Sequence, residues 1–138
     1  MSAVDSSRQS NLELILDWIS ALRQGDVDAI ADLLDPHVVW HGVTGDLMCV
    51  GRAEVIDALR DQVPVRFEVD ALELISASGR VVMGTRSEHL PEPPGVDLKG
   101  QIYNVFERRD GRFIAIRDFA ARDEALRSAG AERQARWA

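Results

Sequence analysis

Apolar residues recur with helical spacing through the first half of the chain. Over residues 11–24 they stand three or four positions apart, which is typical of a helix with one buried side. A second helix is predicted over 26–34, and a third over 52–63, where Pro64 ends the pattern. A short apolar run at 38–41 predicts a strand between the second and third helices.

From Val65 onward the hydrophobic period becomes two, which predicts strands. A slip in this alternation near Asp70-Ala71 predicts a β-bulge that bends the first of them. The segment 91–95 contains three prolines and predicts a long hairpin loop. The three strands that follow the first one are expected over 80–90, 101–108 and 112–120.

These elements predict an α+β fold. Helices gathered on one face of a four-strand antiparallel meander give this class, and a bent sheet wrapped around helices leaves a cone-shaped space between them. The length of 138 residues fits a single domain over 1–138, with 1–10 and 126–138 expected to be flexible or peripheral.

Composition narrows the range of functions. Hydrophobic residues make up 46% of the chain and charged residues 28%, as in a soluble globular protein. A net charge of −7 argues against nucleic acid as a partner. No signal peptide is apparent and no apolar run approaches the roughly 20 residues that cross a membrane, so we expect a cytoplasmic protein.

The residues that commonly bind metals are dispersed. Cys49 is the single cysteine, which excludes a disulfide within the chain. His37, His41 and His89 have no metal-ligand spacing with it or with one another. We therefore expect neither a metal nor another cofactor.

Asp118 is a charged residue in the otherwise largely apolar last strand. Strand alternation places it on the same side as Ile114 and Ile116. An ionised carboxylate is costly to bury unless it is paired, so Asp118 needs polar partners or a shifted pKa.

The hairpin register decides which residues face Asp118. A two-residue turn at Asp110-Gly111 would pair it with Tyr103, whereas a three-residue loop would pair it with Ile102. We favour the second register because it gives a face that is apolar except for two polar groups. The members of that face are Ile102, Asn104, Phe106, Ile114, Ile116 and Asp118.

Arg86 and Glu88 are candidate partners for Asp118. They stand two residues apart on one strand and therefore point the same way. If their face is the concave one, Arg86 lies near both carboxylates, and one carboxylate can act as a base while the other acts as an acid. The alternative is an ordinary surface ion pair on a solvated face.

Several short motifs carry a resemblance to a known family. They are Leu22-Arg23-Gln24-Gly25-Asp26, Val38-Val39-Trp40-His41-Gly42, Gly51-Arg52-Ala53-Glu54-Val55-Ile56 and Arg117-Asp118-Phe119. With them the chain resembles, from about 11 to 125, a SnoaL-like member of the nuclear transport factor two-like superfamily. The resemblance implies a cone-shaped α+β fold with a pocket inside the curved sheet.

Within that superfamily the nearest catalytic pattern is that of the limonene epoxide hydrolases. Arg86-Ser87-Glu88 and Arg117-Asp118-Phe119 are similar to their two acidic motifs. The resemblance implies that Asp118 activates water, that Glu88 protonates the epoxide oxygen of a small apolar substrate, and that Arg86 lies between them. Trp40 and His41 stand where the family places its water-binding Tyr and Asn, and alternation allows only one of them to face the pocket.

Two other functions stay open. SnoaL-type polyketide cyclases carry an acid at the position of Asp118, and a cyclase or ketosteroid-isomerase-like enzyme would use it to abstract a proton from carbon, with Asn104 or His41 holding the oxyanion. A non-catalytic protein of this fold would only bind an apolar ligand. The resemblance also implies a homodimer through the outer face of the sheet, which we expect to be free of helices and to present Tyr103, Val105 and Phe119.

Overall fold

The computed structural model describes residues 3–44, 48–62, 69–77, 79–88, 90, 95 and 97–130, and only the backbone of 3–11, 61 and 62. Residues 65–68 of the strand expected to begin at Val65, the loop residues 91–94, His89 and residues 131–138 lie outside the described part. The helices are α1 (Ala3–Gln24), α2 (Val27–Asp32), α3 (Arg52–Gln62) and α4 (Arg122–Ala129). The strands are β1 (Leu34–His41), β2 (Met48–Val50), β3 (Ala71–Ala77), β4 (Arg80–Arg86), β5 (Gln101–Arg109) and β6 (Arg112–Phe119).

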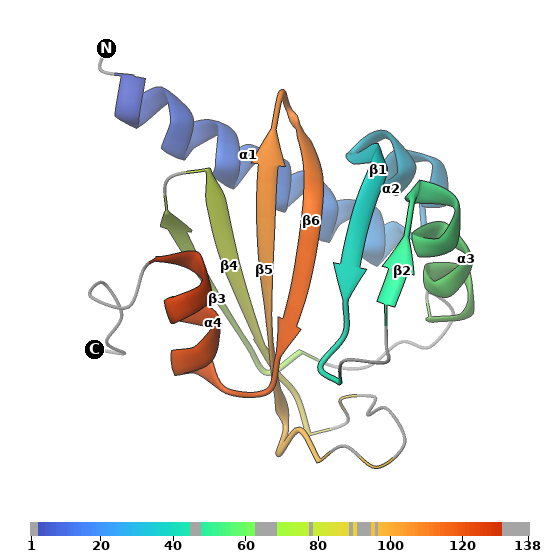
Figure 1. Cartoon of the computed structure of the whole chain (residues 1–138). Coiled ribbons are helices and arrows are strands. Elements are labelled where there is room, and N and C mark those ends of the chain that lie inside the picture. The colour runs from blue at the N-terminus through green and yellow to red at the C-terminus, as the bar shows by residue number, and fades with distance from the viewer. Residues whose placement is uncertain are drawn as a thin grey trace.

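The strands form one curved sheet in the order β2-β1-β6-β5-β4-β3. All neighbouring strands are antiparallel except β1 and β6, which run parallel. In Figure 1 α1 crosses one face of this sheet, α4 lies against the opposite face, and α3 lies beside β1 and β2. The α+β class and the cone-like curvature are confirmed.

Several element boundaries differ from the prediction. The α1 helix begins at Ala3 and includes most of the segment expected to be peripheral. The second helix ends at Asp32, and β1 begins as early as Leu34, so that Pro36 lies inside a strand with an irregular register rather than after a helix. The short edge strand Met48–Val50 was not predicted, because three residues give too little alternation to detect.

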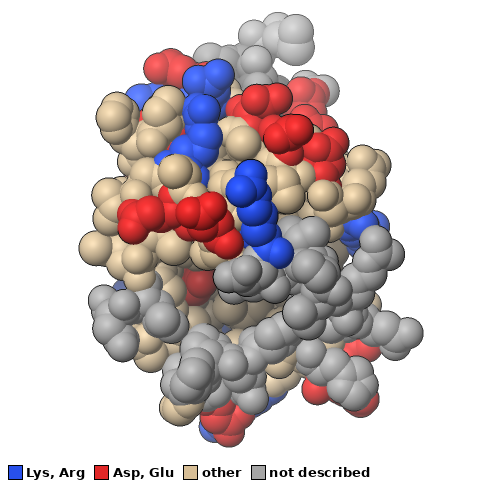
Figure 2. All heavy atoms as spheres, turned by 90° about the vertical axis from the view of Figure 1, so that its right-hand side faces the viewer, with Lys and Arg blue, Asp and Glu red and all other residues tan. Residues whose placement is uncertain are grey.

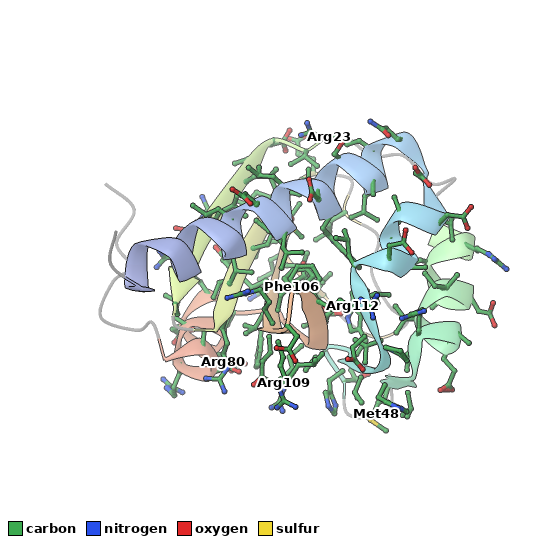
Figure 3. All side chains as sticks on the ribbon, turned by 90° about the horizontal axis from the view of Figure 1, so that it is seen from above. Arg23, Met48, Arg80, Phe106, Arg109 and Arg112 are labelled. Carbon is green, nitrogen blue, oxygen red and sulfur yellow. The ribbon has the colours of Figure 1, made fainter. Side chains whose placement is uncertain are left out.

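The main core lies between α1 and the concave face of the sheet. Ile15, Trp18 and Ala21 of α1 are buried there, as the helical spacing predicts. Figure 3 shows Phe106 of β5 beneath α1. Full burial of each large apolar side chain contributes about 1.5–3 kcal/mol to folding. The sheet and α3 contribute Val38, Val55, Val81, Phe106, Phe113 and Ile116, among others.

A second core lies on the convex face, under α4. Ala125, Leu126 and Ala129 of this helix pack on a surface that includes Tyr103 and Val105. Phe119 packs against the same cluster. The expectation that this face carries no helix is therefore wrong, as is the assignment of residues 126–129 to a peripheral tail. A homodimer through the outer face stays a prediction.

An ion pair fastens α4 to the sheet. The Arg122 guanidinium donates through Nε and Nη2 to the two carboxylate oxygens of Glu73 in β3, at 2.9 and 2.8 Å. The two side chains are 19% and 13% exposed, so the pair is largely shielded from water. This bidentate geometry fixes both direction and distance and anchors the first turn of α4 over β3.

The described residues contain no helix that combines the length and apolar character needed to cross a membrane.

Gly84 in β4 is required by a close approach beneath α4. It pairs with Tyr103, and a Cβ added to Gly84 would stand 2.4 Å from Cε1 of that buried ring. Gly84→Ala should lower the free energy of unfolding by about 1–3 kcal/mol, because the ring has no free space into which it can move. Urea denaturation followed by circular dichroism would measure this change.

The matched control for Gly84→Ala is a double-mutant cycle with Tyr103→Leu. The smaller side chain removes the clash, so Gly84→Ala should cost clearly less in the Tyr103→Leu background than in the wild type. An equal cost in both backgrounds would contradict the steric explanation.

Candidate active site

Asp118 lies on the concave face of the sheet near the end of β6. It pairs with Asn104 of β5, which is neither of the two partners that the hairpin analysis considered. The turn at Asp110-Gly111 has two residues, both with positive φ of 53° and 77°. A register shift then leaves Ile114 without a partner, and this bulge turns Asp118 toward the concave side.

The same bulge changes the apolar face of β6. Phe113 and Ile116 both point into the main core and are fully buried, whereas Ile114 is absent from that core. Ile116 and Phe106 share the concave face, as expected, but they pair directly, whereas the favoured register would have placed Ile116 opposite Asn104. The grouping of Asp118 with Ile114 was wrong because the extra residue reverses the alternation at that point.

Two N–H donors hold one oxygen of the carboxylate. Trp40 Nε1 donates to Asp118 Oδ1 at 2.9 Å, and Asn104 Nδ2 donates to the same oxygen at 2.6 Å. Within the described part of the chain, Oδ2 has no hydrogen-bond partner. The carboxylate is thus fixed through one oxygen while the other is available to a ligand.

The environment of Asp118 changes its acidity. Burial raises the pKa of this carboxyl to about 6, and the hydrogen bonds from Trp40 and Asn104 oppose the increase without cancelling it. Burial dominates because the charged form loses more hydration than two N–H groups restore. A carboxylate with this pKa is ionised at neutral pH and is still a stronger base than an exposed aspartate.

Trp40, and not His41, faces the concave side. Trp40 pairs with Ile116 of β6, while His41 pairs with Arg117 and shares the opposite face. The Trp40 ring lies 5.9 Å from Trp18 of α1, centroid to centroid. Trp18 in turn meets Phe106 and Phe113 edge-on. The indole is therefore held by aromatic packing on one side and by Asp118 on the other.

Arg86 and Glu88 do not join Asp118. Arg86 pairs with Gln101 and shares the convex face with Gly84, opposite the face that carries Asn104. Glu88 is exposed beyond the end of β4, and its backbone N–H donates to Asp70 Oδ2 at 3.1 Å. The predicted cluster of an arginine and two carboxylates is not assembled.

The incorrect prediction of the face to which Arg86 belongs has a clear physical cause. Every residue of β4 from Val81 to Thr85 is buried, since α1 covers one face of the sheet and α4 covers the other. A strand that is buried on both faces loses the alternation that tells its two sides apart. The sequence therefore could not indicate which of the two alternating sets of β4 residues faces the concave side.

The remaining predicted site residues differ in how deeply they are buried. Phe106 and Ile116 are fully buried in the main core and form the floor beneath the site. Ile102 lies nearer the rim of the concave face, is partly exposed, and pairs with Thr85.

Thr85 and Cys49 were not predicted as members of this face. Thr85 shares the face of Met83 on β4, and its side chain is buried. Cys49 pairs with Trp40, and its thiol pKa is raised by burial first and then by the charges of Glu54 and Asp118. The sequence feature that could have indicated Thr85 is a polar residue at the end of the apolar run that begins at Val81.

Two hollows of the surface lie away from Asp118. One of about 500 Å³ is lined by residues of β1 and α3, among them Pro36, Arg52 and Ile56. One of about 80 Å³ lies on the convex face beside Val105 and Arg117. The part of the chain that the structure describes contains no group of three His, Cys, Asp or Glu side chains able to hold a metal.

Basic and acidic side chains are interspersed over the face shown in Figure 2, which is the side of α3 and β2 in Figure 1. Among the described residues visible there, acidic side chains gather in places, whereas the basic ones form no continuous stripe. This distribution offers no basic stripe to a polyanion.

Comparison with known proteins identifies related domains. The family model described as SnoaL-like domain matches residues 15–116. Among curated proteins no relative matches.

Solved structures with the same fold are numerous. A candidate polyketide cyclase of Xanthomonas campestris pv. campestris is 18% identical, with 89% of this chain and 98% of that chain covered and a TM-score of 0.64. A candidate ketosteroid isomerase of Kribbella flavida is 13% identical over 82% of this chain and 78% of the other, with a TM-score of 0.64. A nuclear transport factor two-like protein of unknown function from Cytophaga hutchinsonii is 11% identical over 79% and 88%, with a TM-score of 0.59.

The raised pKa of Asp118 predicts a pH-dependent effect of Asp118→Asn on stability. The unfolded carboxyl titrates near pH 4 and the folded one near pH 6, so the folded state binds more protons between these values and loses stability as the pH rises. Asparagine keeps an oxygen for both N–H donors and carries no charge. Asp118→Asn should therefore be more stable than the wild type above pH 6, by up to about 3 kcal/mol, with the difference vanishing below pH 4.

Urea denaturation of both proteins from pH 4 to pH 8 would measure this difference. Other carboxyl groups affect both proteins alike and cancel in the comparison. A variant that is less stable than the wild type at pH 8 would contradict the dominance of burial over hydrogen bonding.

Trp40→Phe should raise the pKa of Asp118 further. Phenylalanine retains an aromatic ring next to Trp18 but removes the N–H that stabilises the ionised carboxylate. The carboxyl carbon of Asp118, followed by ¹³C NMR through a pH titration, would report the shift.

Trp18→Phe is the matched control, because Trp18 packs in the same aromatic cluster and makes no hydrogen bond to Asp118. Its titration should follow that of the wild type. Equal shifts in the two variants would mean that packing, rather than the indole N–H, sets the pKa.

Proposed function

The chain belongs to the family of SnoaL-like domains, and we propose that it is a cofactor-independent enzyme in which Asp118 is a general base that removes a proton from carbon. The observation that carries this proposal is the state of the Asp118 carboxylate. Its pKa is about 6, one oxygen accepts two hydrogen bonds, and the other has no partner among the described residues. A base is most effective when its pKa lies near the working pH.

The reaction that fits one such base is proton transfer next to a carbonyl group. Asp118 Oδ2 takes the proton from carbon, the C–H electron pair moves into the new C=C bond, and the carbonyl π pair moves onto the oxygen to give an enolate. The protonated Asp118 then delivers the proton to a different carbon of a conjugated enolate, which completes an isomerisation. In a cyclisation, the enolate carbon instead attacks a second carbonyl of the same substrate, the π pair of that carbonyl moves onto its oxygen, and this oxygen takes the proton from Asp118. Both reactions are balanced without a further reactant.

Two related structures support this class of reaction. They are named as a candidate polyketide cyclase and a candidate ketosteroid isomerase, although their low identities carry only the fold. The surroundings of Asp118 also favour a small, largely apolar substrate, since Trp40 and Ile102 are the partly exposed neighbours on its face. A neutral carbonyl compound meets both requirements.

Epoxide hydrolysis has less support. It needs an acid to protonate the epoxide oxygen while the base activates water, and Glu88 and Arg86 lie away from Asp118. Trp40 donates a hydrogen bond but cannot accept one from a water molecule. The single base therefore fits proton abstraction better than attack by water.

Incorporation of solvent deuterium tests the proposal. Cyclic ketones, including 1-indanone and 2-cyclohexen-1-one, would be incubated with the protein in D₂O and followed by NMR and mass spectrometry. The wild type should accelerate C–H exchange of at least one ketone beside or in conjugation with the carbonyl, and Asp118→Asn should reduce that rate by at least 100-fold, the lower end of what general-base catalysis contributes, roughly 10²–10⁴.

Glu88→Gln is the matched control, since it neutralises an exposed carboxylate beyond the end of β4, and it should exchange at the wild-type rate. Exchange that survives Asp118→Asn would remove Asp118 from the role of base. Hydrolysis of limonene oxide with loss of activity in both Asp118→Asn and Glu88→Gln would restore the epoxide hydrolase reading. Saturable ketone binding without any exchange would identify a binding protein.

A further inference from the structure

Three polar atoms on the concave face have no hydrogen-bond partner among the described residues. Two of them belong to residues already discussed. They are Asp118 Oδ2 and the side-chain oxygen of Asn104, whose side chain makes its hydrogen bond to Asp118 through Nδ2. The third is the hydroxyl of Thr85, which takes no part in the mechanism described above. A hydroxyl in such a position calls for an explanation, because buried polar groups nearly always find a partner.

The hydroxyl of Thr85 is sheltered but reachable. The residue is only 6% exposed. Within the described part of the chain, no fully buried side-chain oxygen or nitrogen lacks a hydrogen bond. The unpaired Thr85 oxygen is therefore not fully buried and keeps some contact with solvent. Leu72, which is the β3 partner of Thr85, is 37% exposed and marks that side of the face as open.

Strand pairing fixes where Thr85 stands relative to the base. Met83, Asn104 and Asp118 form one row across β4, β5 and β6, and Thr85 lies two residues further along β4, opposite Ile102. Two strand spacings and two residues put the Cα atoms of Thr85 and Asp118 about 12 Å apart. At this separation the two side chains do not touch, and they can contact different parts of one ligand.

We propose that the Thr85 hydroxyl binds the carbonyl oxygen of the substrate and donates a hydrogen bond to the oxyanion that forms when Asp118 removes the proton. This assignment rests on the proposed function of Asp118 and supplies what that reaction otherwise lacks, a donor at the oxygen that gains charge. The donor is neutral and fixed to an inner strand of the sheet, so little reorganisation accompanies the change in charge. Trp40 cannot take this role because its single N–H already bonds to Asp118.

Binding of two matched probes tests the role of Thr85 without requiring turnover. The probes are 1-indanone and indane, which share a ring system and differ in the carbonyl group. Their dissociation constants would be measured by NMR titration of the Trp40 indole N–H signal. Thr85→Val should weaken 1-indanone about fivefold, which corresponds to one net hydrogen bond of ~1 kcal/mol, and should leave indane unchanged.

Thr85→Ser is the matched control. It keeps the hydroxyl and should bind 1-indanone within about twofold of the wild type, which a purely structural role of Thr85 would not predict. Thermal unfolding would verify that both variants fold, and Thr85→Ala takes the place of the valine variant if that one does not. Equal weakening of both probes, unchanged binding of 1-indanone by Thr85→Val, or no saturable binding of 1-indanone by the wild type would each overturn the proposal.

The same measurements in Asp118→Asn separate the two proposals. Because binding does not need the base, Thr85→Val should weaken 1-indanone selectively in that background as well. If deuterium exchange survives Asp118→Asn while the selective weakening persists, only the role of Asp118 fails. If exchange depends on Asp118 but Thr85→Val binds both probes like the wild type, only the role of Thr85 fails.

Discussion

The arrangement of the site depends on how the carboxylate of Asp118 is buried. Its hydration is lost at the edge of an aromatic core, and two N–H groups replace part of it at a single oxygen. A fully compensated carboxylate would be a weak base, and an uncompensated one would stay protonated at neutral pH. The intermediate case leaves a pKa of about 6, at which the group is ionised and still basic. The other elements of the fold can be understood by how they maintain this balance.

One inserted residue determines that Asp118 faces the core at all. Without the bulge at Ile114, the two-residue turn would carry its register along the hairpin and pair Asp118 with Tyr103 on the convex face. The bulge moves Asp118 opposite Asn104, which becomes one of its donors, and places Phe113 and Ile116 together in the core. A local change in backbone geometry thus selects both the apolar floor of the site and its polar partner.

The sequence predicted the class of fold because helical and strand periods are separated along the chain, and it predicted a carboxylate among apolar residues because Asp118 interrupts such a run. It could not predict the side of β4 that is concave. That strand is buried by α1 on one face and by α4 on the other. The sequence did not indicate that α4 covers the sheet, because α4 is a short segment near the C-terminus that is anchored by the Arg122–Glu73 pair. Arg86 was consequently assigned to the wrong face, and Thr85 was overlooked.

Burial on both faces also explains why the middle of the sheet is suited to position a substrate. Gly84 lets the Tyr103 ring lie flat against β4 under α4, so the backbone that carries Met83 and Thr85 is supported from behind. Side chains on strands held in this way lose little further freedom when a ligand binds, and a preorganised donor stabilises developing charge better than a mobile one. In the proposed reaction, the convex core therefore supports the strand that carries the Thr85 hydroxyl, while the register of β4, β5 and β6 sets its distance from the Asp118 carboxylate.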